Sequence, residues 1–261
     1  MNIKYLAGSI VALPLLPLMY VQGKRIRSGI PDLPEATGNS GSAGSNTESV
    51  LKMLVIGEST IAGIGVKTHE EGFTGTLAKI LAEKTDTTVD WRVYARSGYT
   101  VERVSRKIIP KIEEKEADLI VVGLGGNDAF TLNNPKRWGR QLMELINELR
   151  SKFGEIPIFF TNMPPIKEFP AFTPVIKYVV GNLVEILGDE LERVSKSQGN
   201  VFYSAEKITI GGWTKKFNIE GTAKDFFSDG VHPSKLTYQV WARDFAGFMI
   251  ESSDRIRIKQ D

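Results

Sequence analysis

The sequence predicts a three-layer α/β/α sandwich, in which helices cover both faces of a mostly parallel, five-stranded sheet. Short apolar stretches alternate with segments whose apolar residues recur at helical spacing, from Leu51 to Ile250. Such strand–helix alternation is typical of a parallel sheet with helices on both sides. In addition, Leu119–Leu124 reads LIVVGL, which is the composition of a strand buried on both faces.

The individual elements follow from the positions of the apolar residues. Strands are expected at short apolar runs, namely at residues 51–56, 89–95, 119–124, 156–161 and 201–203. Helices are expected where apolar residues lie three or four positions apart, as in Phe73, Leu77, Ile80 and Leu81. These helices cover residues 73–81, 101–115, 142–149, 174–197 and 236–250. We expect the folded domain to extend over 51–252, followed by a polar tail at 253–261.

Residues 1–22 form an apolar N-terminal segment. The run 5–21 carries no charge and has about the minimum length of a membrane-spanning helix. Pro14 and Pro17 would kink such a helix, although membrane helices tolerate proline better than soluble ones. No small-residue cleavage site follows, which disfavours a signal peptide. We therefore interpret residues 5–21 as an uncleaved membrane anchor, with a helix packed on the domain surface as the alternative.

The residues after this run suggest an orientation and a linker. Lys24, Arg25 and Arg27 follow the run, whereas only Lys4 and the amino terminus precede it. By the positive-inside rule this charge bias favours a cytoplasmic catalytic domain, and a signal anchor would instead export it. Residues 23–50 are rich in glycine, serine and asparagine and poor in apolar residues, so they are expected to form a flexible linker.

The composition excludes several kinds of site. The chain has no cysteine, so disulfides, thiolate metal sites and a cysteine nucleophile are excluded. Its two histidines, His69 and His232, are too few for a three-histidine zinc site. The net charge of +2 provides no electrostatic reason to expect a nucleic-acid partner. Any mechanism that needs an imidazole base must use one of the two histidines.

Polar residues and glycine follow the first three predicted strands. The first strand leads into GEST with Ser59, the second into SGY with Gly98, and the third into GGND with Asn127. Parallel strands end at a common edge of the sheet, where α/β proteins bind their ligands. The stretch DGVHPS, with Asp229 and His232, precedes the last predicted helix. We therefore expect these residues to meet at one site.

These residue types suit a serine hydrolase. His232 can take the proton of the weakly nucleophilic Ser59 hydroxyl, while Asp229 holds the other ring nitrogen. The tetrahedral intermediate needs hydrogen-bond donors for its oxyanion. The backbone N–H groups of Ser59 and Gly98 and the side-chain amide of Asn127 can supply them. The sequence thus predicts a Ser59–His232–Asp229 triad with an oxyanion hole of Ser59, Gly98 and Asn127.

Each residue also has an ordinary structural interpretation. Ser59 could cap a helix, Gly98 could provide a turn with positive φ, and His232 could be a surface-turn histidine. The joint pattern favours catalysis, because the residues follow strands of the same sheet and almost no other histidine is available. His69 stands in the polar stretch KTHEE and is expected to be solvated.

With these blocks in place, the sequence resembles the SGNH or GDSL-like hydrolases, a family of lipases and esterases. The resemblance covers about residues 51–250. The family's serine, glycine, Gly-x-Asn-Asp and Asp-x-x-His blocks are matched by Ser59, Gly98, Asn127, and Asp229 with His232. It implies a flavodoxin-like sheet, no metal or organic cofactor, and esterase, lipase, thioesterase or carbohydrate-deacetylase activity. Glu58 and Thr60 replace the family's usual Asp and Leu, but neither position carries a catalytic atom.

The expected reaction is hydrolysis of a small-molecule, lipid or glycan acyl ester through an acyl-enzyme on Ser59. The alternatives are an acyltransferase with the same triad and a membrane-tethered, non-catalytic binding module. A nucleotide-binding protein is disfavoured, because the stretch GIG at 63–65 lacks the third glycine of a dinucleotide fingerprint.

Aromatic residues near the expected site are candidates for substrate contacts. Phe169 and Phe172 follow the fourth strand, and either form an acyl-binding wall or pack onto the next helix. The stretch before Asp229 contains Trp213, Phe217, Phe226 and Phe227, which form either a pocket rim or a satellite core.

Overall fold

The central sheet has six strands in the order β1-β3-β2-β4-β5-β6, in a computed structural model that describes residues 3–45, 48–222 and 224–252. The strands are β1 (Ser40–Ala43), β2 (Val50–Gly57), β3 (Thr88–Ala95), β4 (Leu119–Gly123), β5 (Ile158–Phe160) and β6 (Val201–Tyr203). β2 to β6 are parallel and have the strand order of flavodoxin-like folds. β1 is antiparallel to β3. The predicted five-stranded parallel sheet is therefore confirmed, with one further strand at its edge.

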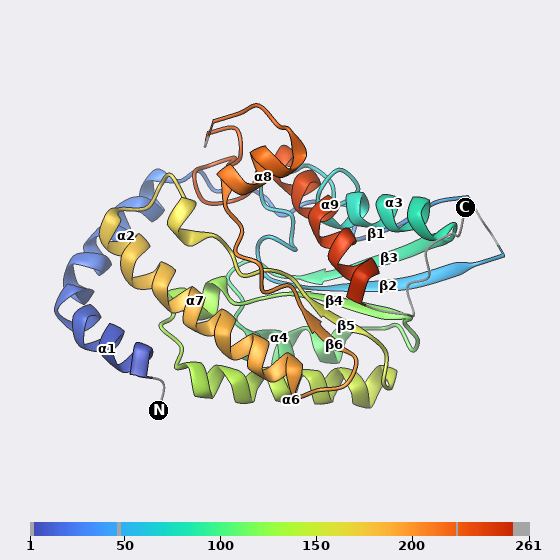
Figure 1. Cartoon of the computed structure of the whole chain (residues 1–261), viewed down its shortest axis with the longest axis horizontal. Helices are drawn as coiled ribbons and strands as arrows, with labels where there is room; N and C mark the ends of the chain where they lie inside the picture. Colours follow the sequence, from blue (N-terminus) through green and yellow to red (C-terminus); the bar gives the residue numbers. More distant parts are fainter. Residues whose placement is uncertain (1–2, 46–47, 223, 253–261) are drawn as a thin grey trace.

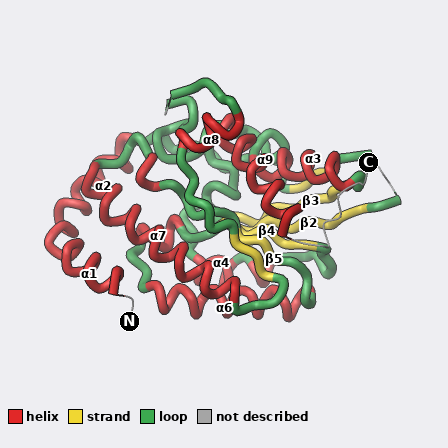
Figure 2. The backbone as a smooth tube through the Cα atoms, in the orientation of Figure 1, coloured by secondary structure: helices red, strands yellow, loops and turns green. Residues whose placement is uncertain are grey.

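Helices cover both faces of the sheet, as predicted (Figures 1 and 2). α3 (Phe73–Thr85) and α9 (Lys235–Ser252) pack together on one face. α4 (Val101–Lys107), α6 (Pro135–Phe153) and α7 (Pro174–Lys196) cover the other face. The remaining helices are α1 (Ile3–Ala12), α2 (Leu16–Gly29), α5 (Gly126–Phe130) and α8 (Ile210–Phe217). In Figure 1, α1 and α2 run alongside α7 at the left.

The central strands are buried on both faces, which explains why they read as unbroken apolar runs. In β2, Leu54 and Ile56 point into the core beneath α4, α6 and α7, whereas Met53 and Val55 point towards α3 and α9. Successive side chains of a strand point to opposite faces, so two cores need apolar residues at every position. The same alternation holds in β4. These two strands form the rigid base of the edge at which the GEST and GGND segments begin.

The structure differs from the expected flexible linker at 23–50 in two parts of this segment. Residues 23–29 belong to α2, and residues 40–43 form β1. β1 escapes an apolar-pattern search because its sequence, SGSA, pairs with the edge of β3 through the backbone. Gly41 lies against the Trp91 ring so closely that a Cβ atom there would collide with it. The folded domain thus includes residues before 51, while the predicted tail at 253–261 lies outside the described residues.

Two further expectations differ from the structure. The helix expected at 101–115 ends at Lys107, and a short 3₁₀ turn that contains Pro110 follows at Ile109–Lys111. Proline cannot donate a backbone hydrogen bond and disrupts the helix around it. His69 is buried, with 4% of its surface exposed, rather than solvated. Its backbone N–H donates to the carbonyl of Thr37 at 3.0 Å, so the stretch around Thr37 packs against it.

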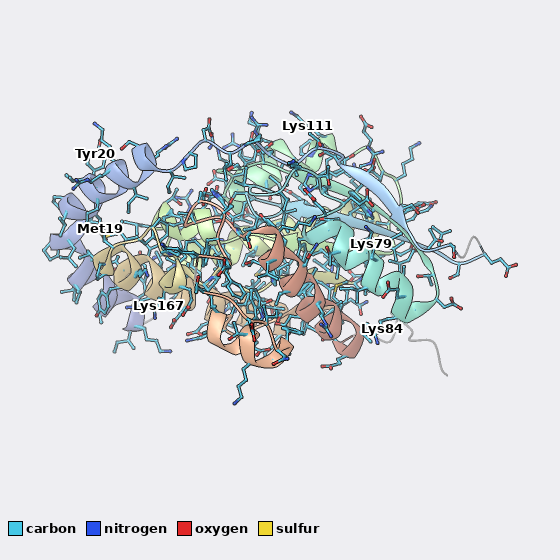
Figure 3. The ribbon with its side chains drawn as sticks, turned by 90° about the horizontal axis from the view of Figure 1, so that it is seen from above. Met19, Tyr20, Lys79, Lys84, Lys111 and Lys167 are labelled. Carbon is cyan, nitrogen blue, oxygen red and sulfur yellow. The ribbon has the colours of Figure 1, made fainter. Side chains whose placement is uncertain are left out.

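The N-terminal helices lie against α7. Thr173, at the start of α7, donates to the Gln22 side chain at 2.6 Å. Near the other end, the Lys4 Nζ atom lies 3.4 Å from Asp189 Oδ2. Met19 packs against the core, whereas Tyr20 is 74% exposed (Figure 3). One side of the apolar segment thus packs on the domain surface, as in the alternative interpretation.

The outer side of these helices remains apolar and exposed. Its large side chains include Leu6, Ile10, Leu18 and Val21. Within the described residues, the helical segment Ile3–Gly29 is the one stretch long and apolar enough to cross a membrane. Length and composition are therefore consistent with the expected membrane anchor.

Candidate active site

A cavity of about 380 Å³ lies at the carboxyl ends of β2, β3 and β4. Ser59, Gly98, Asn127 and His232 all line it. The first three residues follow three neighbouring strands, and His232 comes from the loop before α9. The fold therefore brings together residues that are far apart in the sequence, since Ser59 and His232 are separated by 173 positions.

A tight turn after β2 carries Ser59. The Glu58 N–H donates to the Gly123 carbonyl of β4 at 3.1 Å, and the Ala62 N–H donates to the Glu58 carbonyl at 2.7 Å. β2 and β4 approach so closely here that a Cβ atom on Gly57 would collide with the Gly123 carbonyl oxygen. Glycine at position 57 therefore allows the turn to begin directly at the strand end, with Ser59 half-buried at the cavity.

The side chain of Glu58 joins this turn to the block that contains Asn127. It is 5% exposed, and its two carboxylate oxygens accept the N–H groups of Gly126 at 2.7 Å and Asn127 at 2.8 Å. Burial raises the pKa of Glu58 to about 7, although the two N–H donors favour its charged form. Glu58 thus holds the Asn127 backbone at a fixed position relative to Ser59.

Gly98 and Asn127 lie at the same edge of the sheet as Ser59. Gly98 has a φ of +78°, a backbone conformation that favours glycine. The Asn127 amide nitrogen donates to the Tyr99 carbonyl at 3.1 Å, and the Asn127 side chain also interacts with the Glu58 carboxylate. The adjacent Asp128 is buried and accepts the N–H of Val101 at 3.0 Å, which joins the start of α4 to the same block. Burial raises the pKa of Asp128.

Asp229 and His232 form a hydrogen-bonded pair. Asp229 Oδ2 lies 2.7 Å from His232 Nδ1, and Oδ1 accepts the backbone N–H groups of Val231 at 2.9 Å and His232 at 2.7 Å. The Asp229 side chain is fully buried, whereas 22% of the His232 side chain is exposed. Burial raises the pKa of Asp229, but the hydrogen bonds from His232 and Val231 outweigh it and hold that pKa below its usual range. The carboxylate therefore orients the imidazole and leaves Nε2 free of this contact.

Sequence comparison identifies the family. The model of the GDSL-like lipase/acylhydrolase family matches residues 55–240, which contain the turn of Ser59 and the Asp229–His232 pair. The chain belongs to this family. No curated protein matches it in sequence. As a member of the GDSL-like family, it is a carboxylic ester hydrolase.

Solved structures share the fold of this GDSL-like hydrolase at low sequence identity. TesA is 20% identical with a TM-score of 0.58, and the alignment covers 77% of this chain and 98% of TesA. A member of the lipolytic protein G-D-S-L family from Veillonella parvula DSM 2008 is 15% identical with a TM-score of 0.55, over 77% and 97%. The acetyl xylan esterase AlAXEase is 14% identical with a TM-score of 0.55, over 77% and 100%.

The catalytic residues expected from the sequence lie around one cavity, but one expected contact is absent. Within the described residues of this GDSL-like hydrolase, the Ser59 hydroxyl forms no hydrogen bond, so Ser59 and His232 line the same cavity without a hydrogen bond between them. Such bonds are often long in free enzymes and tighten when substrate binds. The described residues contain no group of three or more histidine, cysteine or acidic side chains suited to a metal ion.

The two candidate substrate-binding phenylalanines separate into different cavities. Phe169 lines the cavity of Ser59. Phe172 instead lines a second cavity, which also reaches His232. The rings of Phe169 and Phe172 are 5.3 Å apart between centroids, and Phe130 lies 5.5 Å from Phe172. These aromatic rings therefore stand between the two cavities.

The aromatic group before Asp229 divides in a similar way. Trp213, Phe226 and Phe227 line the cavity of Ser59, while Phe217 does not. Sequence reasoning missed α8, which carries Trp213, and the carboxylate of Glu58. The signal for Glu58 was the unusual residue at that motif position, but the sequence alone did not reveal its partners.

Proposed function

We propose that this GDSL-like hydrolase cleaves acyl esters through an acyl-enzyme on Ser59, with His232 and Asp229 completing the triad. The observation that supports this mechanism best is the Asp229–His232 hydrogen bond at the rim of the cavity that Ser59 lines. An aspartate on Nδ1 fixes the tautomer in which Nε2 can accept a proton. His232 is therefore prepared to act as the base.

The proposed reaction has two steps. His232 Nε2 takes the proton of the Ser59 hydroxyl as the oxygen attacks the ester carbonyl, and it then returns that proton to the departing alcohol. Water, activated by His232 in the same way, next releases the carboxylic acid and restores Ser59.

The oxyanion that forms in each step needs preorganised donors. The backbone N–H groups of Ser59 and Gly98 have no acceptor within the described residues, and Asn127 lines the same cavity. Donors of this kind stabilise the transition state because they are oriented before charge develops. We propose these three groups as the oxyanion hole.

The test compares the full-length wild-type protein with Ser59→Ala on nitrophenyl acetate, in parallel with fluorophosphonate labelling. We expect the wild type to hydrolyse the ester and to take up the label, and the variant to do neither. Ester hydrolysis by Ser59→Ala at the wild-type rate would overturn the mechanism. The full chain is required because β1 and the residues before it belong to the folded domain.

We also propose that residues 5–21 associate with a membrane. The exposed apolar side chains of α1 and α2 support this, and so do Lys24, Arg25 and Arg27 after the apolar run. This charge bias favours a cytoplasmic catalytic domain, with export through a signal anchor as the opposite outcome. Protease protection in sealed membrane vesicles would distinguish the two orientations.

A further inference from the structure

A second cavity, of about 840 Å³, lies between α2 and the rest of the fold and adjoins the cavity of Ser59. It shares five lining residues with the cavity of Ser59, namely Arg27, Ser97, Phe130, Val231 and His232. The two cavities therefore lie side by side, with His232 at their common wall.

The wall of the second cavity is mainly apolar. α2 contributes Leu16, Met19 and Ile26, while α7 contributes Ile176 and Val180 from the opposite side. Phe172 closes the side nearest the catalytic cavity. Apart from His232, its charged lining residues within the described chain are Arg27 and Asp32. Both follow Leu16, Met19 and Ile26 in the sequence. Such a lining suits a hydrocarbon chain and offers few partners to a polar ligand.

The space continues beyond α2, where charged side chains, among them Lys4, Glu185 and Asp189, join the apolar lining. A third cavity, of about 600 Å³, lies between α1 and α7, and it shares Leu16 and Leu132 with the second. The two cavities together form a groove beneath the N-terminal helices, which we call the α7 groove. It thus leads from the active site along α2 and then along α1.

Contacts near both ends of α7 hold the roof of the α7 groove in place. The Thr173–Gln22 hydrogen bond and the Lys4–Asp189 ion pair show that α1 and α2 run antiparallel to α7. Thr173 and Asp189 are 16 residues apart in the sequence, which corresponds to about 24 Å of helix. One acyl chain of a bilayer lipid extends over half of the hydrocarbon core, or about 15 Å. The groove is long enough for such a chain.

We propose that the α7 groove binds the acyl chain of the substrate, so that this hydrolase acts on long-chain acyl esters of the membrane-lipid type. This inference rests on the proposed Ser59 mechanism. The groove adjoins the catalytic cavity at His232, the proposed base, and this position assigns it to the acyl chain of the ester. The roof of the groove is the same helical segment that exposes an apolar outer face, so a chain can enter from a membrane surface.

Three glycines allow a test without disturbing the core. Gly23 lines the second cavity and Gly8 lines the third, and Gly29 lines neither. A Cβ atom at any of the three would meet nothing within 4 Å. Gly23→Trp therefore fills the groove near the active site, Gly8→Trp fills its far end, and Gly29→Trp is the matched control on α2.

The measurement is kcat/KM of the full-length proteins in phospholipid nanodiscs on acetyl, octanoyl and palmitoyl nitrophenyl esters. The nanodiscs consist of dialkyl ether phospholipids, which cover the apolar face of α1 and α2 and contain no acyl ester for hydrolysis. Their alkyl chains compete for the groove in every protein, so the comparison is between variants in the same nanodiscs. We expect Gly23→Trp to lower the palmitoyl and octanoyl values by about tenfold or more, since each buried methylene contributes about fourfold to binding. Gly8→Trp should lower only the palmitoyl value, and Gly29→Trp should lower none. Acetyl values should agree within about twofold, because acetate does not reach the groove.

The outcomes separate the two proposals. Normal acetyl hydrolysis with an unchanged palmitoyl-to-acetyl ratio in Gly23→Trp would overturn the α7 groove and leave the Ser59 mechanism intact. No hydrolysis of any ester by the wild type would overturn the mechanism. In that case calorimetry with dodecanoate still tests the groove, since Gly23→Trp should weaken binding and Gly29→Trp should not. Equal dodecanoate binding by the two variants would also overturn it.

Discussion

The carboxylate of Glu58 accepts the backbone N–H of Asn127 at 2.8 Å, which links the residue before the proposed nucleophile to a proposed oxyanion donor. A second hydrogen bond, from the Gly126 N–H at 2.7 Å, uses the other carboxylate oxygen. Both oxygens act as acceptors, so this geometry suits the ionised carboxylate. Protonation would turn one acceptor into a hydroxyl and loosen the position of Asn127.

The first prediction concerns the pH dependence that follows from this arrangement. Because burial raises the pKa of Glu58 to about 7, protonation of Glu58 near neutral pH should lower kcat. The acid limb of log kcat should therefore be steeper in the wild type than in Glu58→Gln, which cannot take up this proton. We also expect the variant to have a lower kcat at pH 8, since its amide keeps only one acceptor.

The measurement is kcat from pH 5 to 9 on nitrophenyl acetate, with circular dichroism to verify folding at each pH. A purely structural role of Glu58 would lower stability but leave the steepness of the limb unchanged. Equal steepness in the two proteins would therefore contradict a positioning role for Glu58 in catalysis.

The second prediction concerns His69, whose burial lowers its pKa to about 4, although Glu35 acts in the opposite direction. The unfolded chain has a histidine pKa near 6.5, so it binds a proton between pH 6.5 and 4 that the folded chain does not. The free energy of unfolding should thus fall with decreasing pH in this window, by about 3 kcal/mol in total.

His69→Phe keeps a ring at this position but cannot ionise, so it should remove this part of the pH dependence. Urea unfolding at pH 7 and pH 4.5 provides the measurement. The raised pKa of Glu58 has the opposite sign, because it lowers stability as pH rises from 4.5 to about 7. The comparison is therefore the difference between wild type and His69→Phe at each pH. An identical pH dependence in both proteins would contradict this assignment.

The third prediction concerns the side-chain amide of Asn127. Removal of one oxyanion donor typically lowers the rate by about 10²–10³-fold, so Asn127→Ala should show a loss of this size in kcat with little change in KM. Asn134→Ala is a matched control, because Asn134 caps α6 by accepting the N–H groups of Lys136 and Arg137. The control should lose about 1 kcal/mol of stability and retain its kcat. Equal kcat losses in both variants would indicate a general structural effect.

The sequence predicts the parts of this molecule that depend on local pattern. β2 and β4 are apolar at nearly every position, and the Ser59 and Asn127 segments follow them directly, so their meeting at one edge follows from parallel pairing. β1 has no such pattern, because its stability comes from pairing with β3 and from Gly41 against Trp91. The burial of His69 depends on the covering segment around Thr37. Similarly, the partners of Glu58 are 68 and 69 positions away in the chain.

The last prediction compares the three members of the proposed triad. Ser59→Ala and His232→Ala should each lower kcat by about 10⁶-fold, because nucleophile and base act as a unit. Asp229→Ala should leave more activity, with a loss of about 10⁴-fold, since the carboxylate orients the imidazole but exchanges no atom with the substrate. Asp229 also accepts the backbone N–H groups of Val231 and His232, so the alanine variant loses the shape of this loop as well.

Asp229→Asn separates these two contributions of Asp229. Its Oδ1 atom can still accept both backbone N–H groups, while its amide faces Nδ1 as a donor and favours the wrong tautomer of His232. We therefore expect Asp229→Asn to unfold at nearly the wild-type temperature, in contrast to Asp229→Ala, but to lose a similar share of kcat. Thermal unfolding and kcat on nitrophenyl acetate, measured for both variants, provide the check. Near-wild-type turnover by Asp229→Asn would show that the loop geometry, rather than the tautomer of His232, is what Asp229 contributes.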